Sequence, residues 1–563
     1  MMSTDQYILG IDYGTLSGRA AIVRVSDGHE AGSAITEYKH QVMDRTLTAG
    51  DNQQLPPEFA LQNPQDYLDV LADAVPRALK ESGLDPEQVI GIGIDFTSAT
   101  VIPTDAEGNP LCEREEFKNR PHAYVKLWKH HGGQAQADKL LAVAQTREED
   151  WLPRYGGLMS SELLLPKVLE TFQKDREVYD ATERFVEALD WIVWKMTGNL
   201  VYAAGDSGYK RHYQDGKYPT HEYLEAVATG FGSVYEDKMP GEVQALGSSA
   251  GKLTQELADL MGLNAGIDVA VGNIDAHVSA AAAQAVEPGQ LCAILGTSAV
   301  YVVNGPDLKE VPGMFGVVDG GVVDGLWAFE AGQSGVGDVF AWIVDNCTPA
   351  EYAAEAKDKG VSVHQLLTEK AADQDVGEHG LLCLDWLNGN RSILVDNNLS
   401  GMILGITLTT QPEDLYRALM ESTAFGARRI IQSFQDAGVE INEIVACGGL
   451  LKNTWLMQMY SDVCNLPLSV ATTTQVGALG SAVYGAVAAG CYEDLKTASA
   501  AMGGKEASAY TPDPTRAAQY DALYKEYVEL HDYFGRGANK VMHRLKAIRA
   551  EAHERGVERR EGK

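Results

Sequence analysis

The amino-acid sequence predicts an α/β protein built from two related domains, and three observations lead to this prediction. Short apolar runs rich in Ile and Val alternate with longer segments of helical pattern, which is typical of α/β layering. A unit of apolar strand, Gly-Thr turn and second apolar strand occurs near residue 10 and again near residue 293. The chain has 563 residues, 45% of them hydrophobic, and is long enough for two or more cores.

The positions of strands and helices follow from the same apolar pattern. Strands are expected at residues 7–12, 20–25, 89–95, 100–104, 269–272, 290–295, 299–304 and 443–446. Helices are expected at residues 64–82, 161–174 and 412–437. Asn63 is the expected N-cap of the first helix, and Gly83 follows its end, as glycines commonly do at helix C-termini.

The repeated unit also predicts how the domains divide the chain. Each copy is followed by a later apolar strand that ends in a polar or glycine turn, so we expect domains at residues 1–287 and 288–500, with their boundary at 287–289. Residues 117–218, which are aromatic and mostly helical in pattern, are interpreted as an insertion in the first domain. Residues 501–563 are expected to form a C-terminal helical extension.

The charge balance limits the possible partners. The chain has 46 Lys and Arg against 79 Asp and Glu, a formal net charge of −33 and a pI near 4.7. Such a surface repels phosphate backbones, so nucleic acid is not an expected partner, and acidic membrane surfaces are disfavoured. Residues 536–563 differ, with nine Lys or Arg against four Asp or Glu. This basic tail is expected to be a solvated helix or, alternatively, a contact between subunits of a homodimer.

Cysteine usage and the uncharged segments predict a cytoplasmic protein. Seven scattered cysteines without a C-x-x-C pair are expected to be reduced thiols. The N-terminus lacks the basic and apolar regions of an export signal. The longest uncharged stretch, residues 463–492, contains Pro467 and three consecutive threonines, so we interpret it as a strand, a loop and a buried helix, not a membrane span.

Two turns have the composition of phosphate-binding loops. In the first, Gly14 permits close approach to a phosphate, Thr15 adds a hydroxyl, and Asp12 at the strand end is placed to hold a hydrated Mg²⁺. An ordinary β-hairpin turn also explains this motif taken alone. The second turn, Gly296-Thr297-Ser298, favours a nucleotide site, because two facing hairpins can hold a triphosphate from both sides. Neither turn is a Walker A loop.

Asp275, Gly448–Gly449 and Asn453 are further candidates for a site. Asp275 follows a strand-like run and begins an expected helix, so it is either a general base towards a substrate hydroxyl or a helix N-cap. Gly448–Gly449 follow an apolar strand just before an expected helix at Asn453. Bare backbone there would lie against a purine or ribose, although a tight turn between strand and helix explains the pair as well.

Other conspicuous residues have ordinary explanations when taken singly. Lys210 and Glu330 are expected in glycine-punctuated turns, where a lone charge is more often at the surface. His130–His131 are expected on different faces of a helix and lack the spacing to a third ligand, so a metal site is not expected. Trp191 and Trp194, three residues apart, are interpreted as a core stripe, with a sugar-facing platform as the alternative.

Six motifs occur in an order that resembles one known family. They are DYGT (12–15), GIGIDFTSAT (91–100), GNIDAH (272–277), LGTS (295–298), EAGQS (330–334) and CGGLLKN (447–453). In this order they resemble the FGGY carbohydrate kinases of the actin-like ATPase superfamily, and residues 401–421 resemble that family's C-terminal signature. Five more segments resemble the ketopentose-phosphorylating branch of the family, so that the likeness covers nearly the whole chain: LWKHH (127–131), LPRYGG (152–157), SSE (160–162), ALDWIVWKMTG (188–198) and LHDYFGRGAN (530–539).

The resemblance implies two actin-like, ribonuclease H-like domains around a nucleotide and sugar cleft. The first domain would bind the sugar and the second the adenosine. Carried over by position, the ATP site would comprise Asp12, Gly14, Thr15, Arg19, Gly296, Thr297, Gly448, Gly449 and Asn453, and the sugar site Ser98, Lys210, Asp275 and Glu330. Asp275 would be the general base. Relatives that phosphorylate glycerol carry an amide after this aspartate, whereas Ala276 stands here, which argues against glycerol.

The implied activity is transfer of the γ-phosphoryl group of MgATP to the 5-hydroxyl of L-ribulose, in arabinose catabolism. Another pentulose, D-ribulose or xylulose, is the alternative acceptor. From a different class, an actin-like chaperone or filament protein is the alternative, but it would not need a polar acceptor site at Asp275, Lys210 and Glu330. Closure of the two domains about residues 287–289 is expected to exclude water from the reaction.

Overall fold

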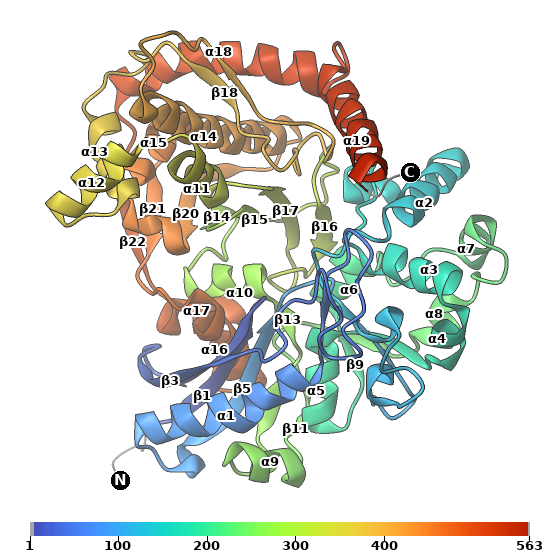
Figure 1. The fold of residues 1–563 in the computed structure, drawn as a ribbon. Helices are drawn as coiled ribbons and strands as arrows, with labels where there is room; N and C mark the ends of the chain where they lie inside the picture. Colours follow the sequence, from blue (N-terminus) through green and yellow to red (C-terminus); the bar gives the residue numbers. More distant parts are fainter. Residues whose placement is uncertain (1–4, 561–563) are drawn as a thin grey trace.

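The first of two large sheets is formed by the N-terminal half of the chain. The computed structural model describes residues 5–560, and Figure 1 labels its elements. In spatial order the strands are β11 (Ser249–Lys252), β12 (Asp268–Ala270), β5 (Val89–Phe96), β1 (Tyr7–Tyr13), β2 (Ser17–Arg24) and β3 (Glu30–Glu37), with β13 (Asn273–Ile274) also paired with β5. β1 pairs antiparallel with β2 and parallel with β5.

The second sheet repeats this arrangement. In spatial order its strands are β16 (Gly316–Asp319), β17 (Trp327–Gln333), β15 (Ala299–Gly305), β14 (Gly289–Leu295), β20 (Ile441–Cys447), β21 (Leu468–Ala471) and β22 (Lys505–Tyr510). β14 pairs antiparallel with β15 and parallel with β20, as β1 does with β2 and β5. The shared topology confirms the α/β class and the internal repeat predicted from the Gly-Thr units.

The segment between β5 and β13 adds a mostly helical lobe to the first half (Figure 1). Its helices are α2 (Gln134–Arg147), α3 (Leu164–Lys174), α4 (Arg176–Ala181), α5 (Ala188–Thr197), α6 (Ala204–Lys210), α7 (His221–Val227), α8 (Val234–Lys238) and α9 (Gln255–Met261). A small sheet has the order β4 (Leu61–Gln62), β7 (Val125–Lys126), β6 (Val101–Thr104) and β8 (Arg184–Glu187), and β9 (Val201–Ala203) pairs with β10 (Glu242–Gln244).

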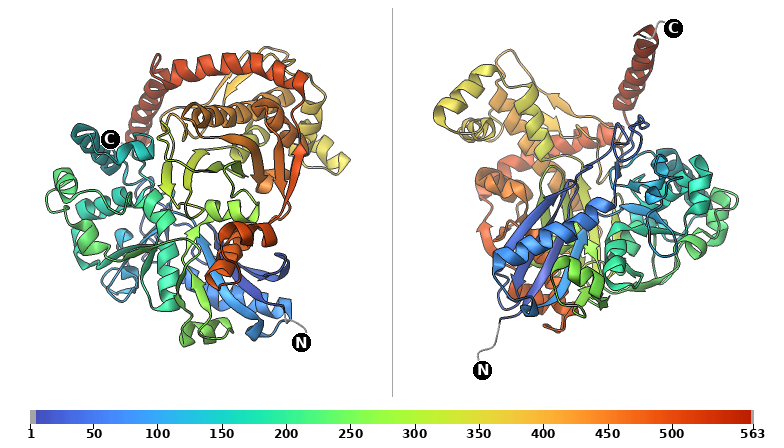
Figure 2. Two further views of the ribbon diagram at one scale, coloured as in Figure 1. Left: turned by 180° about the vertical axis from the view of Figure 1, so that it is seen from behind. Right: turned by 60° about the horizontal axis from the view of Figure 1, so that its bottom comes forward.

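Helices of the second half surround its sheet. They are α11 (Gly337–Asn346), α12 (Ala350–Lys359), α13 (Val363–Ala372), α14 (Pro412–Asp436) and α15 (Thr454–Cys464), beside a two-stranded ribbon of β18 (Leu382–Leu384) and β19 (Met402–Leu404). α18 (Pro514–Gly535) crosses this half, and α19 (Val541–Arg560) projects away from the body (Figure 2). Residues 561–563 of the basic tail lie outside the described residues, and the role of the tail stays a prediction.

Helices cover both faces of the first sheet, and three of them link the two halves. α1 (Gln65–Ser82) covers one face of the first sheet, where Tyr13 donates a hydrogen bond to the Tyr67 carbonyl. The other face is covered by α16 (Val476–Ala488), which comes from the second half of the sequence. A Cβ on Gly93 would lie 1.7 Å from the Ser481 carbonyl oxygen, so glycine allows this close approach. α16 also packs against α10 (Asp275–Ala282), which contacts β14 and β15, while α17 (Leu495–Met502) packs beside both helices.

Most predicted elements are present, with shifted ends. The helix expected at 161–174 begins only at Leu164, because Leu163 is extended and residues 160–162 form a turn. The strand expected at 269–272 ends at Ala270. Residues 463–492 form the end of α15, β21, a loop and α16, as predicted, and no helix among the described residues is long and apolar enough to cross a membrane. All seven cysteines lie in the described part and are free thiols, as expected.

Candidate active site

One cavity of about 350 Å³ lies where the two halves meet. The first residues of α10 and α16 line it, so the positive ends of both helix dipoles face the same space, which favours bound anions. It brings together eight of the residues predicted from the sequence, which are Asp12, Thr15, Ser98, Lys210, Asp275, Gly296, Thr297 and Glu330. They come from both Gly-Thr hairpins, the end of β5, α6, α10 and β17.

Two carboxyl groups, those of Asp12 and Asp275, line this cavity, and a third, that of Asp95, is buried close to them. Asp12 and Asp95 are paired on the adjacent parallel strands β1 and β5, and α10 begins at Asp275. Burial, and after it the charge of the neighbouring Asp12, raise the pKa of Asp275 to about 7. Burial likewise raises the pKa of Asp12 and of Asp95. Asp275 is therefore poised to take up a proton near neutral pH, as a general base must.

The Asp12 and Asp95 pair fits the Mg²⁺ that the family resemblance implies. The Oδ1 atom of Asp95 is buried and has no hydrogen-bond partner among the described residues, and its Oδ2 accepts a hydrogen bond from Ser481. Within residues 5–560, no group of three His, Cys, Asp or Glu side chains is arranged to hold a metal ion. The donor set therefore suits a cation that keeps water and phosphate oxygens among its ligands, as Mg²⁺ does.

Both Gly-Thr turns are tight hairpins whose hydroxyls differ in their surroundings. The Gly14 amide donates to the Ser17 carbonyl over 3.0 Å, and the Gly296 amide donates to the Ser298 carbonyl over 2.9 Å. The Thr15 hydroxyl accepts a hydrogen bond from the Trp128 indole over 3.2 Å. The Thr297 side chain is exposed in the cavity wall. Thr297 is thus the more accessible hydroxyl for a phosphate oxygen.

Lys210 and Glu330 form a buried ion pair, so their interpretation as single surface charges in turns was wrong. Lys210 ends α6 and Glu330 lies within β17, and Lys210 Nζ is 3.4 Å from Glu330 Oε1. His277 Nε2 lies 2.9 Å from the other Glu330 oxygen. Burial would raise the pKa of Glu330, but Lys210, His277 and Arg391 hold it well below its ordinary value. Glu330 is therefore a fixed negative charge in the cavity wall.

Five residues predicted for the nucleotide do not line this cavity. Gly14 and Arg19 lie on the hairpin behind it, and Arg19 pairs with Asp12 across β1 and β2. Gly448 has a φ of 101° and begins a tight turn beside the Leu295 carbonyl. Gly449 is exposed, with open space around its α-carbon. Asn453 caps α15 by accepting from the Leu456 amide. Their binding of ATP stays a prediction.

Several residues in the cavity wall or beside it were not assigned a role from the sequence. Trp128 and Glu162 belong to the LWKHH and SSE motifs, so the resemblance pointed to their segments without giving them a function. Phe315 and Arg391 had no local signal, because an aromatic or arginine residue in a loop is ordinary. His277 follows two residues after the proposed base, where helical spacing alone does not show that it contacts Glu330.

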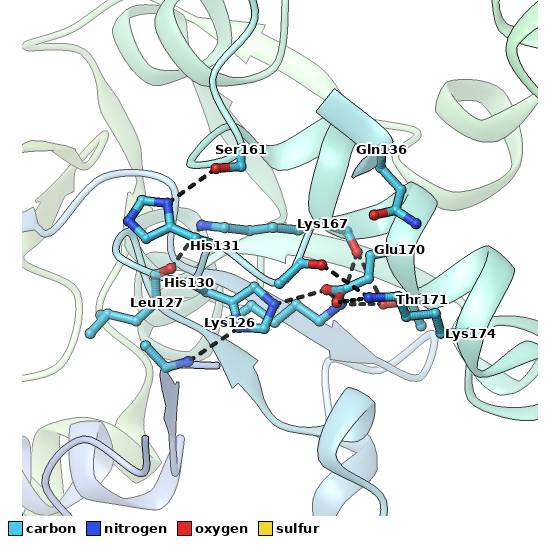
Figure 3. Close-up of polar contacts among 12 residues, drawn as sticks. Lys126, Leu127, His130, His131, Gln136, Ser161, Lys167, Glu170, Thr171 and Lys174 are labelled. Carbon is cyan, nitrogen blue, oxygen red and sulfur yellow. Dashed lines mark hydrogen bonds and ion pairs between the residues drawn. The ribbon is translucent and has the colours of Figure 1, made fainter. Parts of the chain in front are cut away.

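A buried polar cluster holds the wall that carries Ser98 and Trp128 (Figure 3). Glu170 of α3 accepts from Lys126 Nζ over 2.8 Å and lies 2.8 Å from His130 Nε2. Lys167, also of α3, donates to the carbonyls of Ala99 and Leu127, which adjoin Ser98 and Trp128. Burial lowers the pKa of Lys167 to about 7. These contacts fix two cavity segments to one helix.

His130 and His131 belong to this cluster, and the expectation of a helix there was wrong. Both lie in the loop between β7 and α2. This loop is held by side-chain contacts of the two histidines with Glu170 and Ser161, and not by helical hydrogen bonds. His131 Nδ1 lies 3.1 Å from Ser161 Oγ, which joins the LWKHH and SSE motifs. Trp191 is fully buried and donates to the Gly108 carbonyl, which confirms the core interpretation of that residue.

The comparisons with known proteins agree with this architecture. The N-terminal domain of the FGGY family of carbohydrate kinases matches residues 7–282, and the C-terminal domain of that family matches residues 291–489. A ribulokinase from Mycolicibacterium smegmatis is 54% identical over 550 residues, which cover 98% of each chain. A ribulokinase from Halalkalibacterium halodurans is 48% identical over 557 residues, covering 98% of this chain and 99% of its own.

Solved structures show the same fold at lower identity. The gluconate kinase from Lactobacillus acidophilus aligns with a TM-score of 0.78 at 17% identity, over 95% of this chain and 99% of its own. The xylulose kinase from Rhodospirillum rubrum aligns with a TM-score of 0.74 at 24% identity, over 93% and 98%. Because both domains of one family match in order and together span most of the sequence, this protein belongs to the FGGY family of carbohydrate kinases and has their two-domain, actin-like ATPase fold.

Proposed function

We propose that this protein transfers the γ-phosphoryl group of MgATP to the 5-hydroxyl of L-ribulose, giving L-ribulose 5-phosphate and ADP. The observation that carries the proposal is the cavity in which Asp275, the Lys210–Glu330 pair and the Thr297 hairpin face one space. The two relatives at 54% and 48% identity, both ribulokinases, favour L-ribulose over other acceptors. Arabinose catabolism is the pathway in which such a kinase acts, and we propose the cytoplasm as its location.

The chemistry assigns one step to each group of residues. Asp275 accepts the proton of the sugar 5-hydroxyl while the hydroxyl oxygen attacks the γ-phosphorus. The bond between the γ-phosphorus and the oxygen that bridges it to the β-phosphate breaks, so that ADP leaves. Lys210 and Glu330 orient the sugar by hydrogen bonds to its other hydroxyls, which places the reacting oxygen in line. Mg²⁺, held near Asp12 and Asp95 through water, would offset the charge of the phosphates when bound. Thr297 donates its hydroxyl to a phosphate oxygen.

A coupled assay of ADP release with four pentuloses tests the proposal. L-Ribulose is expected to give the highest kcat/KM among L-ribulose, D-ribulose, D-xylulose and L-xylulose. A preference for another pentulose would change the assigned substrate and keep the reaction. ATP hydrolysis that no sugar stimulates would instead favour an actin-like ATPase that is not a kinase, such as a chaperone or filament protein.

Thr297→Val tests the nucleotide side of the cavity. The change removes one hydroxyl and keeps the shape of the turn, so we expect ATP affinity to fall by about 1.5–3 kcal/mol, the usual range for a hydrogen bond to a charged group. Calorimetric titration with ATP measures this loss, and the affinity for L-ribulose in the same variant is the control. Weakened sugar binding with normal ATP binding would show that the turn contacts the other substrate.

Lys210→Ala and Glu330→Ala test the sugar side. Each change leaves the remaining buried charge without its partner and removes a sugar contact, costing roughly 1–3 kcal/mol. We therefore expect kcat/KM for L-ribulose to fall at least about tenfold in each variant, since about 1.4 kcal/mol corresponds to a factor of ten. Lys217→Ala, which alters an exposed lysine paired with Asp150, is the matched control and should leave kcat/KM unchanged. Normal efficiency in both variants would remove the pair from the sugar site.

A further inference from the structure

Arg391 and Glu162 face each other across the same cavity, from opposite halves of the chain. Arg391 lies in the loop between β18 and β19, and Glu162 lies in the turn before α3. Both line the cavity, and their side chains are 19% and 16% exposed. Arg391 Nη2 is 3.5 Å from Glu162 Oε2 and 3.8 Å from Glu330 Oε1. The pair therefore spans the space between the two domains.

The hydrogen-bonding capacity of Arg391 is largely unused. Its guanidinium packs over the Phe315 ring, 4.3 Å from the ring centre, and Lys210 Nζ lies 4.7 Å from the same centre. Arg391 Nε is buried and has no hydrogen-bond partner among the described residues. A contact of 3.5 Å to Glu162 is at the weak limit for a hydrogen bond between charged groups. Phe315 therefore positions the guanidinium, but its N–H groups still have room for further hydrogen-bond acceptors.

Glu162 also has unused hydrogen-bonding capacity. The Arg391 contact is weak, and a carboxylate can accept several hydrogen bonds at its two oxygens. The buried Arg391 Nε lacks a hydrogen-bond partner, which costs free energy, so a ligand that brings an acceptor to Arg391 and a donor to Glu162 is favoured at this point. A polyhydroxylated ketone supplies both, because each hydroxyl can donate to a carboxylate and accept from a guanidinium. A phosphate group would engage Arg391 but would be repelled by Glu162 and Glu330.

We propose that Arg391 and Glu162 are further sugar-binding residues, which hold hydroxyls of the pentulose remote from the reacting one and join the two domains over it. This inference rests on the proposed kinase function. Arg391 donates to a sugar oxygen, and Glu162 accepts from a sugar hydroxyl. Because the two side chains come from different halves of the chain, contacts to one sugar molecule stabilise the closed arrangement, and closure excludes water from the transfer.

The test compares Arg391→Met and Glu162→Gln with wild-type enzyme on the pentulose that the wild type phosphorylates best. Each variant is expected to raise the KM for that sugar at least tenfold while the KM for ATP changes less than threefold. In the double variant, the KM for the sugar is expected to rise by less than the product of the two single increases, because both residues hold the same ligand. Thermal unfolding midpoints of all variants show whether each is folded.

Arg154→Met is the matched control. Arg154 also packs on an aromatic ring of the other half, 5.3 Å from the centre of Trp327, but it does not line the cavity, so the KM for sugar should stay unchanged. A raised KM for ATP with a normal KM for sugar, or unchanged values in folded variants, would overturn the inference while the kinase assignment stands. A wild-type protein inactive on every pentulose would overturn the proposed function and this inference with it.

Discussion

Asp275→Asn is expected to lower the turnover of L-ribulose by about two orders of magnitude or more, the usual effect of removing a positioned general base. The amide keeps the size of the side chain and can still accept from the Ala276 amide, as Asp275 Oδ1 does over 2.7 Å, so the start of α10 should be preserved. ATP affinity and the thermal unfolding midpoint should therefore stay close to wild type. Near-normal turnover in a folded variant would show that another group takes the proton.

The pH profile gives an independent check on the same residue. A pKa of about 7 means that below neutral pH Asp275 is protonated in most molecules and cannot accept the hydroxyl proton. We expect kcat/KM for the sugar to rise between about pH 6 and 8 and then level off. The residual activity of Asp275→Asn should lack this rise. A wild-type profile that is flat over the same range would contradict the assignment.

Glu170→Leu is expected to lower the free energy of unfolding by about 3–5 kcal/mol, the cost of leaving a buried charge without its partner. Glu170 is fully buried, and in the wild-type protein its carboxylate lies 2.8 Å from the buried ammonium of Lys126. The change leaves this ammonium without its partner. Urea unfolding followed by tryptophan fluorescence measures the loss. Glu177→Leu is the control, because that side chain is 77% exposed and its ion pair with Arg120 should contribute less than about 1 kcal/mol.

The stability difference should also depend on pH in a defined direction. Burial would raise the pKa of Glu170, but Lys126 and His130 hold it well below the ordinary value. A carboxyl group with a depressed pKa in the folded state stabilises the protein above its unfolded pKa, about 4.3, and this contribution is lost as the pH falls. The gap between wild type and Glu170→Leu should therefore narrow below about pH 4. A gap of constant size on acidification would show that the charge is not what stabilises the cluster.

Local patterns determined much of this protein. Strand periodicity and the repeated Gly-Thr turn were enough to predict two related α/β units, because alternating apolar runs and turn glycines act over a few residues. The same holds for α16, whose Gly and Ala content predicted close packing, and for Asp275 at the start of a helix. The order of six motifs, read as a family resemblance, supplied the kind of reaction.

Only the tertiary structure decided which side chains meet. Lys210 and Glu330 are 120 positions apart, and each alone resembled a surface charge until the fold buried them as a pair. Arg391 and Glu162 are 229 positions apart, and nothing in either segment shows that the two side chains meet. α16 belongs to the second half by sequence but covers the first sheet. Local propensity depends on neighbours along the chain, whereas burial, charge pairing and the pKa of Asp275 depend on groups that the sheets and helices bring together in space.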